Sequence, residues 1–165
     1  MLYWIIMNSS LIRRLIDFSK LKFEIRSAMR YDDVGDYFEN TIVAYDMKDP
    51  IINNSIMLHE FIEYTLIKSA GIPVSMIDDF DTKDGAEEEH PEEFKLYRKF
   101  HRMANRIECQ FIENLGLNWK VHEKTIDTAK VEIAMRTIEE ELHKEHPSEE
   151  KIEDSKEVVE ETFAK

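Results

Sequence analysis

Two side chains, His59 and Glu63, have the types and the spacing that bind one metal ion. They lie four positions apart in the segment LHEFIE (58–63), so on an α-helix both project from the same face, about one turn apart. In the HExxH motif the two end residues bind zinc, and the glutamate after the first histidine is a general base. By this comparison Glu63 is a ligand and Glu60 is the candidate catalytic base. A motif this short also arises by chance, and the alternative is an ordinary amphipathic helix with one polar face.

A second segment carries a similar set of polar side chains at helical spacing. His101, Asn105 and Glu108 occupy positions i, i+4 and i+7, which lie along one face of a helix. Antiparallel packing of the two helices would bring their polar faces together. His59, Glu63 and His101 would then form a set of two histidines and one glutamate with an open fourth position, the usual composition of a catalytic zinc site.

Four side chains are therefore the expected metal ligands: His59, Glu63, His101 and Glu108. Neutral imidazoles favour a borderline ion such as Zn²⁺, and another divalent metal is the alternative. Glu108 is either a fourth ligand or the partner that orients a ligand imidazole. Asp81 has the same two alternatives, with helix capping as a third. Asn105 is expected to be a hydrogen-bonding helper and His90 a spare ligand, whereas His122 is expected near a helix start without a part in the site.

The spacing of apolar residues predicts the strands that support these helices. Leu21, Phe23 and Ile25 alternate with charged residues, which is typical of a half-buried strand. Residues 37–47 are rich in β-branched and aromatic types and are expected to be its partner strand. The turn-forming residues 31–36 (YDDVGD) between them predict an antiparallel hairpin. This hairpin must pack on helices, because two strands alone are marginally stable.

Helical periodicity accounts for most of the remaining chain. A helix that carries the HExxE motif is expected over 51–70 with Gly71 as its stop, and another over 92–115 with Gly116 as its stop. The other expected segments are a short helical turn, an exposed acidic loop and a long final helix, at 74–80, 82–93 and 122–146, respectively. The predicted fold class is therefore α+β: a mainly helical single domain with a small N-terminal antiparallel β-hairpin packed on the HExxE helix.

Composition divides the chain into three parts. Residues 1–20 are an N-terminal extension with an expected amphipathic helix, 21–146 are the metal-site domain, and 147–165 are an acidic tail. The tail is either a surface helix or disordered. The apolar start, LYWIIM, is too short to span a bilayer and lacks the features of a secretory signal, so no membrane segment is expected. Met7 is an alternative to Met1 as the true start.

Net charge and cysteine content exclude several classes of protein. The chain has 35 acidic and 22 basic residues and a formal charge of −13, which disfavours nonspecific nucleic-acid binding because an acidic surface repels phosphates. Cys109 is the only cysteine, so an intrachain disulfide and a cysteine-rich zinc cluster are both excluded. These features indicate a cytoplasmic protein. The expected partners are an unidentified substrate, with peptides as candidates, and a protein bound through the C-terminal helix.

Five short motifs occur in an order and spacing that resemble a group of small phage and prophage proteins. They are the sequences VGD, LHEFIE, IDDFD, HxxAxxIE and LGLNW, at 34–36, 58–63, 77–81, 101–108 and 115–119, respectively. The resemblance covers about half the chain and implies that these residues belong to one site: His59, Glu60, Glu63, Asp81, His101 and Glu108. It implies the host-cell cytoplasm as the location of a phage-encoded protein, and it implies no particular reaction. His90 stands where the group has an acidic residue.

Three functions fit these patterns. The first is a minimal zinc-dependent hydrolase resembling a metalloprotease, in which the metal acidifies a water molecule that Glu60 helps to deprotonate. The second is a phage-derived interaction or structural module whose metal is structural or absent. The third is a phosphoesterase-type metal hydrolase, in which Asp81 and the two glutamates support a second, harder ion. An open coordination position beside a groove would favour the first function, and two ions about 3.5–4 Å apart would favour the third.

Overall fold

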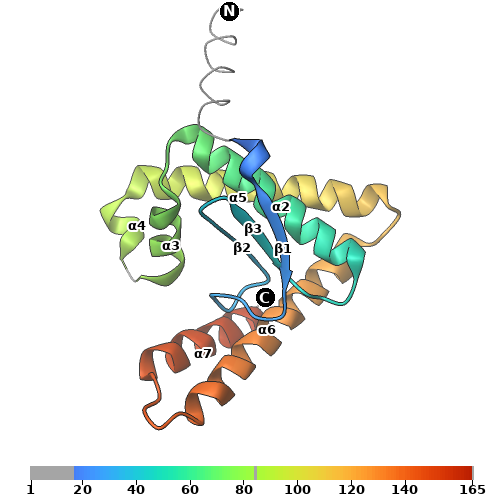
Figure 1. The fold of residues 1–165 in the computed structure, drawn as a ribbon. Coiled ribbons are helices and arrows are strands. Elements are labelled where there is room, and N and C mark those ends of the chain that lie inside the picture. The colour runs from blue at the N-terminus through green and yellow to red at the C-terminus, as the bar shows by residue number, and fades with distance from the viewer. Residues whose placement is uncertain (1–16, 84, 165) are drawn as a thin grey trace, which may run out of the picture.

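The computed structural model describes residues 17–83 and 85–164, which form a three-stranded sheet with helices packed on it (Figure 1). The elements in chain order are η1 (Phe18–Lys20), β1 (Lys22–Arg26), β2 (Gly35–Phe38), β3 (Thr41–Tyr45), α2 (Pro50–Ala70), α3 (Val74–Thr82), α4 (Ala86–Glu89), α5 (Pro91–Asn114), α6 (Trp119–Leu142) and α7 (Glu149–Phe163). The expected α+β, mainly helical class is confirmed. Of the extension expected over 1–20, only 17–20 are described, and the short 3₁₀ helix η1 lies there. The rest of the expected N-terminal helix lies outside the described residues.

The three strands form a mixed sheet in the order β1–β3–β2. β2 and β3 are antiparallel and are joined by a tight turn at Glu39 and Asn40, where Glu39 has a φ of +52°. β1 is parallel to β3 along its whole length. The expected hairpin between 21–26 and 37–47 is therefore wrong. The second segment contains its own polar turn, and the connection after β1 crosses the end of β3 before β2 begins.

Helix α2, which carries the HExxE motif, begins and ends where the sequence predicts. The Asp49 side chain accepts hydrogen bonds from the backbone N–H groups of Ile51 and Ile52, which caps the helix. Pro50 occupies the first turn, where its missing N–H is not needed. Gly71 ends the helix in the left-handed conformation, with a φ of +76°. The helix lies across one face of the sheet and packs against α5 (Figure 1).

Two groups of buried apolar side chains hold α2 in this position. The first group contains two register partners of the β2–β3 hairpin and four residues of α2, α3 and the segment between them: Tyr37, Ile42, Tyr64, Ile67, Ile72 and Ile77. The second group joins α2 and the sheet to α6: Val34, Ala44, Ile56, Ala129 and Ile133. Because the burial of apolar surface is the main favourable term in folding, these groups set how α2 is seated on the sheet.

The segment expected to be an exposed acidic loop, 82–93, is mostly helical. It contains the end of α3, the one-turn helix α4 and the start of α5. Pro91 lies in the first turn of α5, where proline is favoured because its φ suits a helix. The expected helix over 92–115 is confirmed by α5, and the helical turn expected at 74–80 is confirmed by α3.

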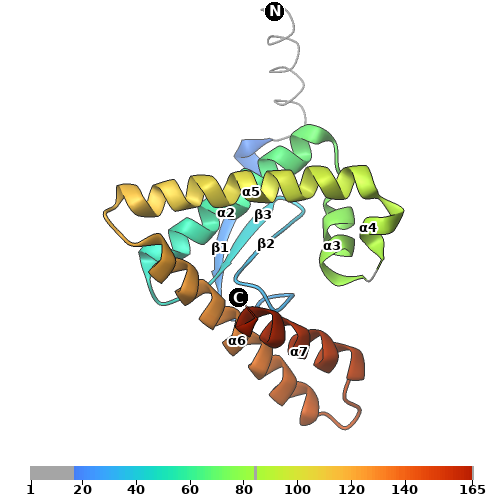
Figure 2. The same ribbon diagram turned by 180° about the vertical axis from the view of Figure 1, so that it is seen from behind.

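Helix α6 starts at Trp119, three residues before the expected start, and ends at Leu142, four residues before the expected end at 146. The earlier start is due to Asn118, whose side chain accepts a hydrogen bond from the backbone N–H of Val121 and caps the helix. The acidic tail forms helix α7, which lies beside α6 and makes with it a helical hairpin that projects from the rest of the molecule (Figure 2).

Asp32 ties this helical hairpin to the loop that follows β1. Its carboxylate accepts a hydrogen bond from Thr137 of α6 at 2.7 Å and another from Ser155 of α7 at 2.5 Å. Ser155 is buried, so α7 is held against the body of the protein at this point. Within the described residues, no helix has the length and apolar character that crossing a membrane requires.

Candidate metal centre

Helices α2 and α5 carry the side chains of the candidate site and run antiparallel. His59 of α2 is hydrogen-bonded to Glu108 of α5. Glu63, one turn later on α2, is hydrogen-bonded to His101, about two turns earlier on α5. His59, Glu63 and Glu108 are all buried. The two polar faces therefore meet in the interior, as antiparallel packing of the two segments requires.

Three of the expected ligands lie close enough together to hold one metal ion. One donor atom from each of His59, Glu63 and His101 lies within 4.8 Å of the other two. Oε2 of Glu63 is 3.9 Å from Nε2 of His59 and 2.8 Å from Nδ1 of His101. These distances bracket the separation of about 3.4 Å between two ligands that each lie about 2.1 Å from a tetrahedral ion. Small side-chain movements would therefore bring the group to the geometry of a metal site.

This group of three is buried on one side and open on the other. The side chains of His59 and Glu63 are 9% and 5% exposed, whereas that of His101 is 47% exposed. The centroids of the two imidazole rings are 4.9 Å apart and their planes are inclined by 66°. The group can therefore be reached from solvent on the side of His101.

Tyr37 of β2 orients the carboxylate of Glu63. The tyrosine hydroxyl donates a hydrogen bond to Oε1 of Glu63 at 2.9 Å, which leaves Oε2 facing the two histidines. Burial, followed by the negative charge of Glu63, raises the pKa of Tyr37 well above its ordinary value. The hydroxyl consequently keeps its proton and remains a donor. A partner of this kind fixes the orientation of a carboxylate ligand.

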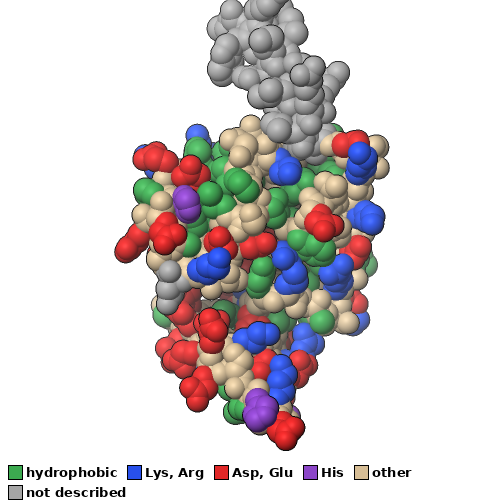
Figure 3. All heavy atoms as spheres, turned by 60° about the vertical axis from the view of Figure 1, so that its left-hand side comes forward, with side chains coloured by type: hydrophobic (Ala, Val, Ile, Leu, Met, Phe, Trp, Pro, Cys, Tyr) green, Lys and Arg blue, Asp and Glu red, His purple; other side chains and the backbone are tan. Residues whose placement is uncertain are grey.

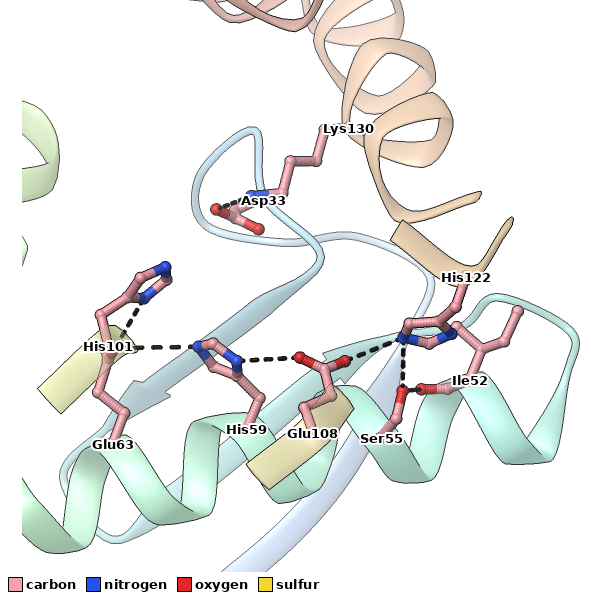
Figure 4. Close-up of polar contacts among 9 residues, drawn as sticks. All are labelled: Asp33, Ile52, Ser55, His59, Glu63, His101, Glu108, His122 and Lys130. Atoms are coloured by element: carbon pink, nitrogen blue, oxygen red, sulfur yellow. Dashed lines mark hydrogen bonds and ion pairs between the residues drawn. The ribbon is translucent and has the colours of Figure 1, made fainter. Parts of the chain in front are cut away.

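Glu108 lies outside the group of three and bridges two histidines (Figure 4). Its Oε2 is 3.0 Å from Nδ1 of His59, and its Oε1 is 3.0 Å from Nε2 of His122. Burial would raise the pKa of Glu108, but the hydrogen bonds with His122 and His59 outweigh burial and lower the pKa to about 2. Glu108 contacts the nitrogen of His59 that is turned away from Glu63. Of its two expected roles, this position matches the partner that orients a ligand imidazole.

His122, for which the sequence predicts no part in the site, is buried beside Glu108. It lies in the first turn of α6, and its Nε2 is also 3.1 Å from Oγ of Ser55 on α2. Its ring packs near the ring of Trp119, with centroids 5.3 Å apart. The local signal for this placement is the cap at Asn118, which puts His122 inside the helix. Nothing in the spacing of α6 indicates which side of the helix packs on α2.

Glu60 lies on α2 beside the group of three, with its carboxylate against the backbone of Gly35. A Cβ atom on Gly35 would be only 2.1 Å from Oε1 of Glu60. Burial, followed by the charge of Glu63, raises the pKa of Glu60 well above its ordinary value of 4.5. Neither a hydrogen bond nor an ion pair joins this carboxylate to another of the described residues. This carboxyl group therefore holds a proton more tightly than an exposed glutamate does.

A cavity of about 230 Å³ opens beside the group, and its polar lining is mainly acidic. The carboxylates that line it are Asp32, Asp33, Asp36, Glu60, Glu63, Asp78 and Asp81. Arg30 forms ion pairs with Asp36 and Asp78, and Lys130 forms one with Asp33. Of the two histidines in the group of three, His101 lines the cavity. The space-filling view shows acidic side chains grouped around a hollow in this face (Figure 3).

The remaining expected site residues differ in how close they come to the group. Asp81 lines the cavity and accepts a hydrogen bond from the hydroxyl of Tyr97 at 2.8 Å. Burial raises the pKa of Asp81 to about 7, although the bond from Tyr97 opposes this change. His90 is exposed at the N-terminal end of α5, and Asn105 is half-buried on α5. In the described part of the chain, neither is hydrogen-bonded to the group of three.

No protein-family model matches the chain, and the comparisons with curated proteins and with solved structures found no match. The resemblance to small phage and prophage proteins therefore stays a prediction that rests on the sequence motifs. The class of site that the fold defines is a group of two histidines and one glutamate that could hold a metal ion. This group lies on two antiparallel helices at the edge of an acidic cavity.

Proposed function

We propose that the chain is a zinc-dependent hydrolase in which His59, Glu63 and His101 are the metal ligands. The observation that carries this proposal is the meeting of these three donor side chains at the edge of a cavity, with His101 exposed. Two histidines and one glutamate form the ligand set of known catalytic zinc sites, which keep a fourth position for water. The hydrogen bonds from Tyr37 and Glu108 support the proposal, because catalytic metal sites orient their ligands through such partners.

The neighbouring residues have distinct roles in the proposed reaction. A zinc ion held by His59, Glu63 and His101 would supply Lewis acidity, which would lower the pKa of a water molecule there towards neutrality. Glu60 lines the same cavity as Glu63 and His101, and its carboxylate is free to take a proton. It accepts the proton of the attacking water and returns it to the leaving group, as a general base and then a general acid. Gly35 leaves the space that this carboxylate occupies.

Peptides or other amides are the substrate class that we favour. The HExxE motif places a glutamate next to a ligand histidine, as in zinc peptidases, so this part of the proposal rests on analogy. The lining of the cavity adds a preference for positive charge. Seven carboxylates line the cavity, whereas Arg30 and Lys130 form ion pairs with three of them. A substrate with a lysine or arginine side chain near the scissile bond would place its charge among these carboxylates.

Two alternatives have less support. A phosphoesterase of the two-metal kind needs a second set of ligands about 3.5–4 Å from the first ion. Across residues 17–83 and 85–164, His59, Glu63 and His101 are the one group found whose donor atoms are close enough. A structural module would be favoured by closed coordination from four protein ligands. The exposed side chain of His101 and the separate pairing of Glu108 support an open site instead.

The metal content of protein purified without chelators and without a His-tag tests the ligand assignment. We expect about one equivalent of zinc in the wild type, and little or none in His59→Ala and His101→Ala, because each loses one of three ligands. His143→Ala is the matched control, because His143 is exposed and its Nδ1 is 2.7 Å from the backbone carbonyl of Glu139, in its own helical turn. Full zinc content in both ligand variants, or none in the wild type, would overturn the proposal.

Glu60→Gln separates metal binding from catalysis. This variant keeps the three ligands, so its zinc content should equal that of the wild type. Its hydrolysis of peptides and esters that the wild type cleaves should fall by about 10²–10⁴-fold, the usual contribution of a general base. Equal rates in the two proteins would remove Glu60 from the mechanism. The assay should include His59→Ala, because hydrolysis that persists in this variant would come from a contaminating hydrolase.

A further inference from the structure

Ser55, in the second turn of α2, sets the direction of a chain of buried hydrogen bonds. Its hydroxyl is 2.9 Å from the backbone carbonyl of Ile52, to which it donates its only proton. The same oxygen is 3.1 Å from Nε2 of His122. Because the hydroxyl proton is already used, this oxygen can only accept from His122. Nε2 of His122 must therefore carry a proton.

The same N–H group of His122 also faces Glu108, whose second oxygen determines where the proton of His59 lies. Nε2 of His122 is 3.0 Å from Oε1 of Glu108, so the carboxylate oxygen accepts there. Its other oxygen, Oε2, is 3.0 Å from Nδ1 of His59. An ionised carboxylate is an acceptor only, so Nδ1 of His59 carries a proton. In a neutral imidazole the other nitrogen then has a free lone pair. That nitrogen is Nε2, which faces Glu63.

We infer that Ser55 and His122 are positioning residues that hold His59 in the tautomer able to bind a metal through Nε2. The inference deepens the proposed function, because it rests on His59 as a ligand. Figure 4 shows the connected path from Ile52 through Ser55, His122 and Glu108 to His59. Its members come from α2, α5 and α6, so the docking of α6 completes the site although α6 supplies no ligand.

Burial gives this path its effect on the site. Ser55, His122 and Glu108 are 0%, 6% and 6% exposed. A water molecule therefore has little room to replace a lost partner. If the imidazole of His122 is removed, the carboxylate of Glu108 loses one of the two donors that hold it. The carboxylate is then free to turn, and His59 can exchange between its two tautomers.

Nitrogen chemical shifts of the histidine rings test the inference directly. Long-range ¹H–¹⁵N spectra of metal-free, ¹⁵N-labelled protein at mildly alkaline pH distinguish protonated from unprotonated ring nitrogens. The wild type should show His59 protonated at Nδ1 and His122 protonated at Nε2. His122→Leu should show averaged His59 signals, and its zinc affinity should fall about tenfold, the lower end of the loss seen for partners of metal ligands. An Nε2-protonated His59 in the wild type would overturn the inference.

A conservative variant and a matched control separate positioning from packing. His122→Gln keeps an N–H donor near the position of Nε2 and should restore the single tautomer of His59 and most of the zinc affinity. His143→Leu removes an exposed histidine at the end of α6 and should leave both measurements unchanged. If His122→Leu remains folded with unchanged His59 shifts and zinc affinity, His122 is a packing residue only.

The two readouts keep the inference and the proposed function distinguishable. The tautomer of His59 is measured without metal and does not depend on any enzymatic activity. If the wild type binds no zinc but its His59 shifts change in His122→Leu, the proposed function fails and the hydrogen-bonded path stands. If the wild type and His122→Leu bind zinc equally well, the proposed function stands and the positioning role fails.

Discussion

The carboxylate of Glu60 lies so close to the backbone of Gly35 that a Cβ atom at position 35 would displace it. A Cβ atom there would be 2.1 Å from Oε1 of Glu60 and 2.6 Å from its Cδ. Gly35 does not have a positive φ, unlike Gly71 and Gly116. The glycine therefore leaves the space that the Glu60 carboxylate occupies, and no unusual backbone conformation calls for it. Strand β2 and helix α2, which carries the HExxE motif, meet at this point.

Gly35→Ala should displace the carboxylate of Glu60 and slow hydrolysis while leaving the metal ligands in place. We expect zinc content equal to that of the wild type, a loss of activity approaching that of Glu60→Gln, and a loss of stability of about 1–3 kcal/mol from overpacking. The measurements are zinc content, kcat/KM on a substrate found by screening, and urea unfolding.

Gly71→Ala is the control for that variant. Gly71 has open space around it but a φ of +76°, so the substitution should cost about 1 kcal/mol in backbone strain without changing activity. If Gly35→Ala is as active as the wild type, the position of Glu60 against Gly35 is unimportant for the reaction.

Tyr37→Phe should weaken zinc binding about 10–100-fold, because it removes the donor that orients Glu63. Competition titration against a chromophoric chelator measures the change. Tyr64→Phe is the matched control: Tyr64 is also buried, but its hydroxyl donates to the backbone carbonyl of Glu39, away from the site. Both variants should lose about 1 kcal/mol of stability. Equal zinc affinities in the two variants would contradict the role given to Tyr37.

Ionisation of Glu108 should make the free energy of unfolding of the metal-free protein depend on pH in the acidic range. Its pKa is lowered in the folded state from an ordinary 4.5 to about 2. A lowered folded-state pKa gives stabilisation that is present above about pH 4.5 and is lost as the pH falls towards about 2. For this buried carboxylate the contribution is on the order of 3 kcal/mol. Glu108→Gln should lack this dependence, so the stability difference between variant and wild type should shrink over that pH range.

Urea unfolding of both proteins, followed by circular dichroism at several pH values, measures this difference. The other carboxylates are common to both proteins, so their contributions largely cancel in the comparison. Parallel stability curves for wild type and Glu108→Gln between about pH 4.5 and 2 would show that the histidines do not hold the carboxylate ionised.

Ser155→Ala should loosen α7 from the loop after β1. The substitution removes one of the two donors to the carboxylate of Asp32 and should cost about 1–2 kcal/mol. Val158 of the same helix lines the cavity, so hydrogen exchange should rise in α7 and around the site. Ser69→Ala is the control, because the Ser69 hydroxyl donates only to a carbonyl within α2. A loss of stability no larger than that of Ser69→Ala would argue against this anchor.

Substrates with positive charge should be preferred over otherwise identical acidic ones. Seven carboxylates line the cavity, and Arg30 and Lys130 form ion pairs with three of them. We expect kcat/KM for a peptide with lysine beside the scissile bond to exceed that of the glutamate peptide by about tenfold or more, and the ratio to fall as salt is added. Equal rates at low salt would show that the acidic lining does not contribute to selection.

The helices and the faces they present could be predicted from the sequence because their signals are local. Asp49, Pro50 and Gly71 mark the ends of α2 by capping and backbone preference alone. The four-residue spacing of His59 and Glu63 puts them on one face of that helix wherever the helix packs. The same reasoning places His101 and Glu108 along one face of α5.

Strand pairing could not be predicted in this way. The residues of β1 and of the β2–β3 hairpin have strand-forming types, but this preference is the same whichever neighbour a strand pairs with. The parallel pairing of β1 with β3 depends on the path of residues 27–34 across the end of β3. The turn at Glu39 needs a positive φ that a glutamate rarely adopts, so the sequence contains little sign of it.

The sequence by itself determined which side chains could serve a metal site: His59, Glu63, His101 and Glu108 occupy two helical faces, and helical periodicity requires no knowledge of the fold. Only the tertiary structure decided their separate roles, because the rotation and register of packed helices depend on contacts between residues far apart in the chain. Those contacts turn Glu108 towards Nδ1 of His59, join it to His122 of α6, and leave Glu63 and His101 facing the cavity.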